Sequence, residues 1–430
     1  MWMPPWSART CWWCLLLATC IVRGGFTLLD DDSLRADVDD YRLLASHLVN
    51  QGTFGYGEQP TAFRPPLYPL LLVAATGGGR FDPAGIALLH VAFGAATVML
   101  TWSAGRRLGL SPEFATLAGL LVAVDPILLR QSTAVMTETA AAFVAALALW
   151  CLIRASQEAS IPGWVIAGGA LGAAALTRPT FLVWIALVAP VCVTRPKDVR
   201  MRLRVGAAIA LLAGVAILLF PWVLRNQLRF GRPIVGTTHG GFTLLLANNA
   251  SFYKHLRTQS WFTTWDAAEF NKQWAATLPR RTRHQELESQ DAAYRAAWRA
   301  MRAETDMLAA AVAYRWSRLW GVLPLATVED ESPGARFARY AVAIWYIAGW
   351  LLVLRAALAM RSELFAPPWG YAVALWLALT VVHALFWTDM RMRAPAVPSL
   401  ALAAAVGASV LAGRISKRKP RFTQALSTDD

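Results

Sequence analysis

Residues 205–224 read VGAAIALLAGVAILLFPWVL, a run of 20 residues without a charged side chain. A helix of about 20 apolar residues matches the thickness of the hydrocarbon core of a bilayer. Further apolar blocks follow one another along the chain, separated by short charged or Pro- and Gly-containing stretches. The predicted spans are residues 10–29, 84–103, 112–129, 138–153, 162–176, 180–193, 205–224, 338–354, 369–387 and 398–411.

The composition agrees with these spans. Of the 430 residues, 56% are hydrophobic and 16% are charged, and the mean hydropathy is +0.41. A soluble core of this size does not need so much apolar surface. We therefore expect an all-α polytopic membrane protein with about ten transmembrane helices, which form a single domain over residues 1–430. The apolar run that ends near Val22 lacks a small residue before a cleavage point, so we expect it to remain as the first span.

Basic residues predict the orientation of the spans. If the N-terminus is cytoplasmic, the short connections rich in Lys and Arg all lie inside, which is the positive-inside pattern of a plasma-membrane protein with both termini in the cytoplasm. The inner basic residues are Arg106, Arg107, Arg154, Arg195, Lys197, Arg200, Arg202, Arg204, Arg355, Arg361 and those of the tail, residues 414–430. The net charge of +14 then reflects orientation and contact with membrane lipids, and we expect no nucleic acid partner.

Two long segments then face the periplasm or the cell exterior, residues 30–83 and residues 226–336. They are the first and fourth outer loops, and we expect the functional site there, because loops carry sites while spans carry scaffold. Apolar spacing in both loops predicts helices that lie on the membrane surface. The first loop is acidic, with Asp30, Asp31, Asp32, Asp37, Asp39 and Asp40. Its plainest interpretation is a solvated acidic loop.

Asp37 and Arg64 suggest more than solvation. Asp37 starts a short helix, and Tyr41 and Leu44 lie on the apolar face of that helix. Arg64 precedes two prolines, which keep the backbone extended where the chain enters the next apolar stretch. Other cations on the outer side run against the positive-inside trend: Arg178, Arg225, Arg229, Arg232, Arg391 and Arg393.

Glu138 begins the fourth predicted span near the outer face. One interpretation is that its carboxylate only balances the dipole of the helix that it starts. The other is a place in a functional site.

A series of short motifs resembles one known family. The motifs are Asp37 to Tyr41 with Gly52 and Phe54, Pro60 to Pro69, TAVMTETAAAF around Glu138, Leu176-Thr177-Arg178-Pro179, Pro221-Trp222, Arg225-Asn226, Gly240-Gly241, Asn248-Asn249 and RMRAPAVPSLAL from Arg391. In this order they are similar to the GT-C superfamily of membrane glycosyltransferases. The similar branch is glycosyltransferase family 39, with the protein mannosyltransferases and the aminoarabinose transferase of lipid A.

The resemblance implies a GT-C type bundle and an inverting transfer of a sugar from a polyprenyl phosphate to an unidentified hydroxyl acceptor. It implies that Asp37 is the general base and that Glu138 lies in the active site. A carboxylate can take the proton of the attacking hydroxyl. Guanidinium groups can stabilise the charge on the departing phosphate.

Arg64 is the implied phosphate ligand, and the other candidates for this role are Arg178, Arg225, Arg391 and Arg393. The implied substrate contacts are Tyr41, Tyr68, Asn226 and Asn248. Asp37, Asp39 and Glu138 could hold Mg or Mn in principle, but we predict no metal and no cofactor.

Two other classes compete with an enzyme. A transporter or lipid flippase is also polytopic and basic, but it would place charged groups at the membrane midplane. An assembly protein that kept the fold without activity has no physical reason to retain an exposed acid and a proline-held arginine.

Overall fold

The computed structural model describes residues 7–30, 32–76, 82–193, 200–277, 283–326 and 331–413. Asp31, Arg195, Lys197 and the predicted basic tail, 414–430, lie outside these ranges. The bundle contains α1 Ala8–Leu29, α4 Pro83–Arg107, α5 Pro112–Ala123, α6 Pro126–Ser132, α7 Glu138–Glu158, α8 Ile161–Thr177, α9 Thr180–Val193, α10 Met201–Phe230, α16 Pro333–Met360, α17 Trp369–Leu385 and α18 Val397–Leu411. The first loop contains η1 Asp32–Leu34, α2 Tyr41–Gln51, the antiparallel pair β1 Gly55–Tyr56 and β2 Gln59–Pro60, and α3 Leu67–Ala75. The remaining elements are α11 Gly240–Ala247, α12 Ala250–Thr258, α13 Ala268–Thr277, α14 Arg283–Ala303, α15 Thr305–Trp320, η2 Arg361–Phe365 and η3 Met390–Ala396.

Each predicted span coincides with a helical segment. Among the described residues, six helical segments are long and apolar enough to cross a membrane: α1, α4, α7, α10, α16 and the η3–α18 segment. The helices α5 and α6 meet the same criterion together, with a bend of 49°, and form either a broken span or a re-entrant loop. The other predicted spans coincide with the shorter apolar helices α8, α9 and α17. The predicted all-α polytopic fold is therefore confirmed, and the chain is a multi-pass membrane protein.

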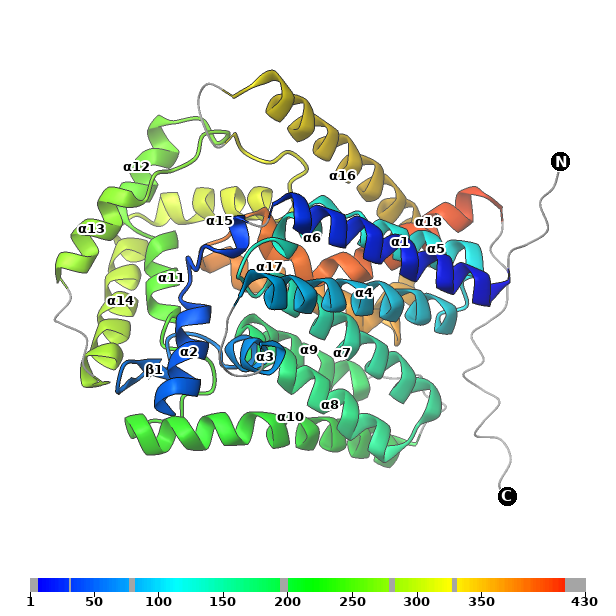
Figure 1. Cartoon of the computed structure of the whole chain (residues 1–430), viewed down its shortest axis with the longest axis horizontal. Helices are drawn as coiled ribbons and strands as arrows, with labels where there is room; N and C mark the ends of the chain where they lie inside the picture. The colour runs from blue at the N-terminus through cyan, green and yellow to red at the C-terminus, as the bar shows by residue number, and fades with distance from the viewer. Residues whose placement is uncertain are drawn as a thin grey trace.

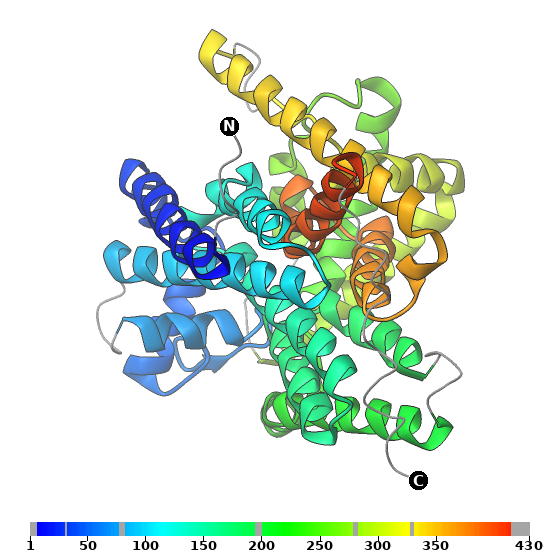
Figure 2. The same ribbon diagram turned by 90° about the vertical axis from the view of Figure 1, so that its right-hand side faces the viewer.

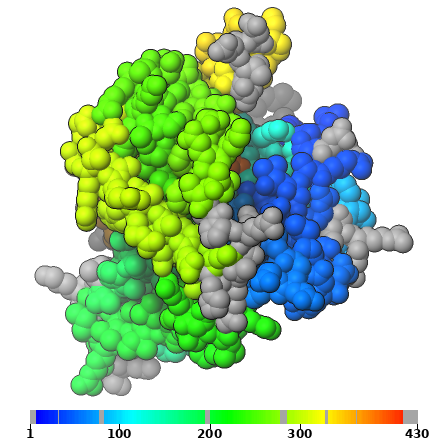
Figure 3. All heavy atoms as spheres, turned by 90° about the vertical axis from the view of Figure 1, so that its left-hand side faces the viewer, coloured from blue at the N-terminus to red at the C-terminus, as the bar shows by residue number. Residues whose placement is uncertain are grey.

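The long helices run side by side (Figure 1). The short connections between them lie at one end of the bundle, and the two long segments that were predicted as outer loops lie at the opposite end. α1 begins and α18 ends at one end, and α2, β1 and α11 to α14 gather at the other. At that second end, the surface of the first loop lies beside the surface of the later segment that contains α11 to α15 (Figure 3). The predicted helices of both loops are thus present.

The centre of the bundle is α7 and its edge is α16. In their apolar windows, 78% of the residues of α7 are buried but only 17% of those of α16. Alanine occupies seven of the fifteen buried positions of α7, so its neighbours can approach closely. Figure 2 shows α16 along the outside of the bundle, next to α18. Because Glu138 is the first residue of α7, the fold places this carboxylate on the central helix, at one end of the bundle.

Glycines set the contact between α8 and α10. A Cβ at Gly168 would lie 1.9 Å from the carbonyl oxygen of Leu211, and one at Gly214 would lie 2.0 Å from that of Val165. The two backbones touch because neither glycine has a side chain. This contact helps to hold the C-terminal end of α8, where Arg178 follows.

Candidate functional site

Glu138 lies between two arginines. Its side chain is 1% exposed, and Nη2 of Arg178 is 2.7 Å from its Oε1. Nε of Arg391 lies 3.5 Å from the same oxygen. Arg178 follows the last residue of α8, and Arg391 comes from η3. Three elements that are distant in sequence thus bring two cations to one buried carboxylate, and a second carboxylate, that of Asp389, pairs with Arg391.

Neighbouring groups hold both arginines in place. Nε of Arg178 donates to Oγ1 of Thr137 at 3.0 Å. Nε of Arg391 donates to Oδ2 of Asp389 at 3.0 Å, while Oδ1 of Asp389 accepts from the backbone N–H of Arg391 at 2.9 Å. Asp389 therefore starts η3 and orients the arginine that follows it.

Each of these arginines also donates to a methionine sulfur. Nη1 of Arg178 is 3.4 Å from Sδ of Met392, and Nη1 of Arg391 is 2.8 Å from Sδ of Met136. A thioether sulfur is a weak acceptor. An oxygen of a phosphate would be a stronger partner for the same N–H groups. The cluster can therefore take an anion without breaking its ion pairs to Glu138.

Arg64 forms a second ion pair, with Asp39 and not with Asp37. Its Nη2 lies 2.7 Å from Oδ1 of Asp39, and its Nε donates to the carbonyl oxygen of Asp39 at 3.1 Å. Its Nη1 lies 3.2 Å from Nδ1 of His239, at the start of α11. Burial, and next the charge of Arg64, lower the pKa of His239 to about 3, so the imidazole is neutral and accepts this hydrogen bond.

Tyr41 is buried between the two ion pairs. The guanidinium of Arg64 lies 5.6 Å from the centre of its ring. Burial raises the pKa of Tyr41 to about 12, and the charges of Arg64, Asp39, Arg178 and Glu138 also act on it. Tyr41, the first residue of α2, therefore lies within electrostatic range of both the Arg64 pair and the Glu138 cluster.

Asp37 lies at the start of α2. Its Oδ1 accepts from the backbone N–H of Arg42 at 3.2 Å, and its Oδ2 accepts from that of Leu43 at 2.9 Å. Asp40 adopts a left-handed conformation with φ of 61°, so the chain folds back and lets Asp37 reach these groups. The carboxylate is therefore held in one orientation and is partly exposed to solvent.

Glu286 of α14 connects the large outer segment to the first loop. Its Oε2 accepts from Oγ1 of Thr61 at 2.7 Å, and its Oε1 accepts from the N–H of Ala62 at 2.9 Å and from Oγ1 of Thr238 at 2.5 Å. One carboxylate thus joins α14 to the stretch that leads into Arg64. α14 helps to fix the first loop over the bundle.

Arg225 and Asn226 serve the same connection. Arg225 donates to the carbonyl oxygens of Thr61 and Phe54, each at 2.8 Å, and to Oδ1 of Asn226 at 2.8 Å. Asn226 donates to the carbonyl oxygen of Ile234 at 2.9 Å. Both side chains tie α10 to the first loop, and their roles in phosphate and substrate binding stay predictions.

Arg393 points away from the Glu138 cluster. It is 1% exposed, its Nη1 donates to the carbonyl oxygens of Leu319 and Gly321, and its guanidinium lies 4.1 Å from the ring centre of Tyr346. The side chains of Arg391 and Arg393 leave η3 in different directions, and the phosphate contact of Arg393 stays a prediction.

Asn248 and Tyr68 are also used inside the fold. Asn248 is fully buried, donates to two backbone carbonyls and accepts from the hydroxyl of Tyr253 at 3.0 Å. The hydroxyl of the fully buried Tyr68 lies 2.8 Å from Nε2 of His90. Both side chains are buried and hydrogen-bonded within the fold, as Tyr41 is buried beside Arg64, and the substrate contacts of all three stay predictions.

The structure adds residues that the sequence did not single out. Asp389 orients the guanidinium of Arg391, and Met136 and Met392 lie against the guanidiniums of Arg391 and Arg178. The position of Asp389 two residues before Arg391 was a weak signal for an ion pair. Within the described ranges, no group of three or more His, Cys, Asp or Glu side chains is arranged to hold a metal ion.

Comparisons with known proteins agree with this arrangement. Residues 64–224 match the family model of the dolichyl-phosphate-mannose-protein mannosyltransferases. This stretch begins at Arg64 and includes Glu138 and Arg178. No curated protein matches the sequence.

Several solved structures are similar. One is the archaeal oligosaccharyltransferase AglB from Archaeoglobus fulgidus in complex with an inhibitory peptide and a dolichol-phosphate. Its sequence is 13% identical and the TM-score is 0.53, and the match covers 95% of this chain and 52% of the AglB chain. Its apo form has 12% identity and a TM-score of 0.54, covering 94% and 51%. ArnT from Cupriavidus metallidurans bound to undecaprenyl phosphate has 16% identity and a TM-score of 0.41, covering 93% and 78%.

The chain spans about half the length of AglB. The family model and the solved structures together confirm the resemblance of this chain to the GT-C superfamily of membrane glycosyltransferases, of the family 39 type. The resemblance covers residues 64–224 in sequence and nearly the whole chain in fold.

Proposed function

We propose that this protein is an inverting glycosyltransferase that moves a sugar from a polyprenyl phosphate to a hydroxyl on a lipid, glycan or protein. The observation that carries the proposal is the buried Glu138 with Arg178 and Arg391 on one oxygen, next to the Arg64 pair. Arg178, Arg391 and Arg64 bring three guanidinium groups to this site, and guanidinium groups are strong hydrogen-bond donors to a phosphate.

The proposed leaving group is the polyprenyl phosphate. Its charge grows as the bond between the anomeric carbon and the phosphate oxygen breaks. Arg178, Arg391 and Arg64 come from α8, η3 and the first loop, and each is held by a neighbouring side chain, so little reorganisation is needed when the charge appears. The N–H groups that now face methionine sulfur would turn to the phosphate oxygens.

Asp37 is the proposed base. The acceptor hydroxyl gives its proton to the Asp37 carboxylate while its oxygen attacks the anomeric carbon, and the sugar changes configuration as the phosphate leaves. Glu138 is poorly placed for this task, because two guanidiniums already surround its carboxylate. We assign to Glu138 the role of holding these cations in position.

The orientation is part of the proposal. The site lies at the end of the bundle where α2 and α11 are found, whereas Arg107 and Arg200 lie at the opposite ends of α4 and α10 (Figure 1). If basic residues mark the cytoplasmic side, the site faces the periplasm or the cell exterior. The donor would then enter from the outer leaflet.

Release of polyprenyl phosphate by purified protein in detergent tests the proposal. A panel of polyprenyl-phosphate sugars is offered with lipid, glycan and peptide hydroxyl acceptors, and wild type is expected to release polyprenyl phosphate from one donor. Asp37→Asn should abolish this release, because an amide cannot take the proton. Asp40→Asn is the matched control, since Asn also adopts the left-handed conformation and can accept from Tyr56.

Two results would count against the proposal. Full activity of Asp37→Asn would remove the assignment of the base. Binding of a polyprenyl-phosphate sugar without any transfer, in detergent where no gradient exists, would instead favour a transporter or flippase.

A further inference from the structure

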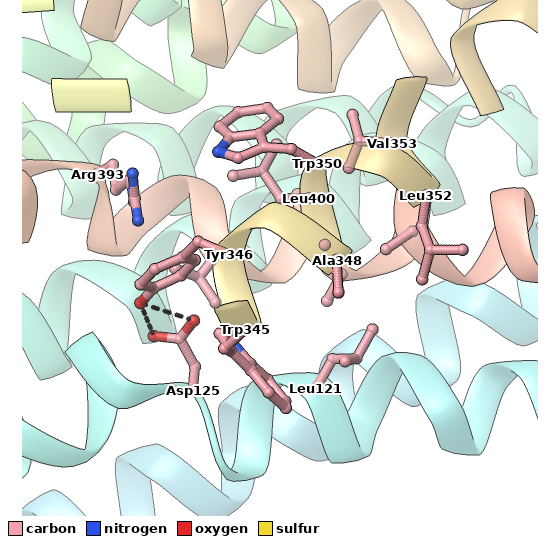
Figure 4. Close-up of a pocket in the computed structure, with 14 residues that line it drawn as sticks. Leu121, Asp125, Trp345, Tyr346, Ala348, Trp350, Leu352, Val353, Arg393 and Leu400 are labelled. Atoms are coloured by element: carbon pink, nitrogen blue, oxygen red, sulfur yellow. Dashed lines mark hydrogen bonds between the residues drawn. The ribbon is translucent and has the colours of Figure 1, made fainter. Parts of the chain in front are cut away.

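A cavity of about 140 Å³ lies between α5, α16 and α18 (Figure 4), and its lining does not include Glu138, Arg178 or Arg391. Most of its wall is apolar, and its lining includes Trp345, Gly349, Trp350, Leu400, Ala401 and Ala404. Small residues on facing helices leave this space open. None of these residues has a role in the proposed transfer.

One end of the cavity is polar. The hydroxyl of Tyr346 donates to Asp125, 3.3 Å from each carboxylate oxygen, as drawn in Figure 4. Arg393 lines the same end, with its guanidinium over the Tyr346 ring. Its Nη2 is buried and has no hydrogen-bond partner in the described part of the chain. A buried, unpartnered guanidinium nitrogen is costly unless a ligand satisfies it.

A second cation makes the charge balance positive. Arg23 of α1 is 1% exposed and donates to the carbonyl oxygen of Val122 at 2.8 Å. The charges of Arg23 and Arg393 both act on Asp125. Two buried guanidiniums thus lie within electrostatic range of one carboxylate in apolar surroundings, and an anion at the open end would compensate the remaining positive charge.

The cavity lies beside the lipid-facing side of α16. Ile344, Ile347 and Leu351 are 68%, 46% and 62% exposed on this helix, which is typical of a surface in contact with acyl chains. The polar end lies where η3 leads into α18, at the same end of the bundle as Glu138, and the apolar part extends along the helices. A phospholipid has the same division into a phosphate and a chain.

We propose that this cavity binds an anionic phospholipid of the adjacent leaflet, with its phosphate at Arg393 and part of one acyl chain along α16 and α18. The volume is below the ~300 Å³ of pockets that enclose a whole ligand, so only a segment of the chain enters. Because Arg391 and Arg393 both belong to η3, the bound lipid would also stabilise the element that carries Arg391 to Glu138.

Lipid binding to the purified full chain tests this inference without any transfer assay. Native mass spectrometry and thermal unfolding in detergent compare phosphatidylglycerol with phosphatidylcholine of the same acyl chains. Phosphatidylglycerol should bind about tenfold more tightly and raise the unfolding midpoint more than phosphatidylcholine does. The choline cation of phosphatidylcholine would offset the negative charge of the phosphate, which is the charge that pairs with the arginines.

Two substitutions locate the binding. A Cβ at Gly349 meets no atom within 4 Å, so Gly349→Leu should fill the cavity without displacing the backbone and remove the preference for phosphatidylglycerol. Gly25→Leu is the matched control, because a Cβ at this exposed glycine of α1 also meets nothing. Arg393→Gln keeps a donor for the carbonyls of α15 and should reduce the preference by removing the charge.

Three outcomes would overturn the inference. Equal binding of the two lipids would remove the charge recognition. Unchanged binding in Gly349→Leu would place the lipid elsewhere. If polyprenyl phosphate alone occupied the cavity and phosphatidylglycerol did not, the cavity would belong to the donor.

Discussion

Arg391 and Arg393 are two residues apart, yet their guanidiniums serve different clusters. In a 3₁₀-helix with about three residues per turn, positions i and i+2 point to different sides. The same holds in the first loop, where Asp39 pairs with Arg64 and Asp37 holds the start of α2. At the scale of residues, the direction of each side chain decides which charge it meets.

Glu138→Gln tests the central ion pairs. Removing the charge leaves Arg178 and Arg391 without their buried partner, and we expect the free energy of unfolding in detergent to fall by about 3–5 kcal/mol. Asp389→Asn is the control, because Asp389 is 41% exposed and an Asn oxygen can still accept the backbone N–H of Arg391. Its cost should be about 1 kcal/mol or less. Equal losses in the two variants would contradict the central place of Glu138.

The neutral His239 predicts a pH dependence of stability. Its folded pKa of about 3 lies below the ordinary value near 6.5, so only the unfolded chain binds a proton as the pH falls. The contribution is present above pH 6.5 and is lost progressively between about 6.5 and 3. By pH 5 this group should lower the free energy of unfolding by about 2 kcal/mol.

His239→Gln should remove this part of the pH dependence, since the amide does not titrate and its oxygen can still accept from Arg64. Thermal unfolding at pH 7 and pH 5 gives the comparison. An identical fall in the variant and in wild type would show that His239 is not held neutral.

At the scale of elements, close contact of helices positions the charged residues. The backbones of α8 and α10 touch at Gly168 and Gly214, and Arg178 follows α8 directly. Arg225 near the end of α10 then reaches the carbonyls of the first loop. A shift of one helix against the other would therefore disturb both Arg178 and the loop that carries Arg64.

Gly214→Ala should weaken this contact. The added methyl would lie 2.0 Å from a backbone oxygen of α8, so the helices must separate, at a cost of about 1–3 kcal/mol. Gly206→Ala, in the same helix, has its closest neighbour at 3.9 Å, and it should be neutral or stabilising. Thermal unfolding of the two variants measures the difference. A tolerated Gly214→Ala would show that α8 and α10 have room to move apart.

At the scale of the whole molecule, the two ends of the bundle differ in chemistry. One end carries the site and the large outer segment, and the described basic residues of the short connections, such as Arg107 and Arg200, lie at the other (Figure 1). The helices between these ends separate the two environments. By the positive-inside rule the basic end would face the cytoplasm, where its arginines can contact anionic lipids, and the chain would have one defined orientation in the membrane.

Cysteine labelling of intact cells tests the orientation. Starting from a chain whose five cysteines are replaced by alanine, Glu288→Cys on the exposed side of α14 should react with a membrane-impermeant maleimide. Arg154→Cys, near the opposite end of α7, should react only after the membrane is permeabilised. The reverse pattern would place the site on the cytoplasmic side.

The sequence by itself determined where the helices lie and which face of α2 is apolar. These features depend on the local run of residues, so a window of about 20 positions contains the information. Tyr41, Arg64 and Glu138 could be identified from the same local motifs.

Only the tertiary structure decided which charges meet. Glu138 joins Arg178 and Arg391 because α7, α8 and η3 converge at one end of the bundle, and no local pattern reports contacts between such distant segments. Arg225 and Arg393 are arginines in similar sequence surroundings, but backbone carbonyls of other elements take up their donors. Since buried polar groups must find partners, the packing of the helices decides which arginines remain for a ligand and which hold the fold together.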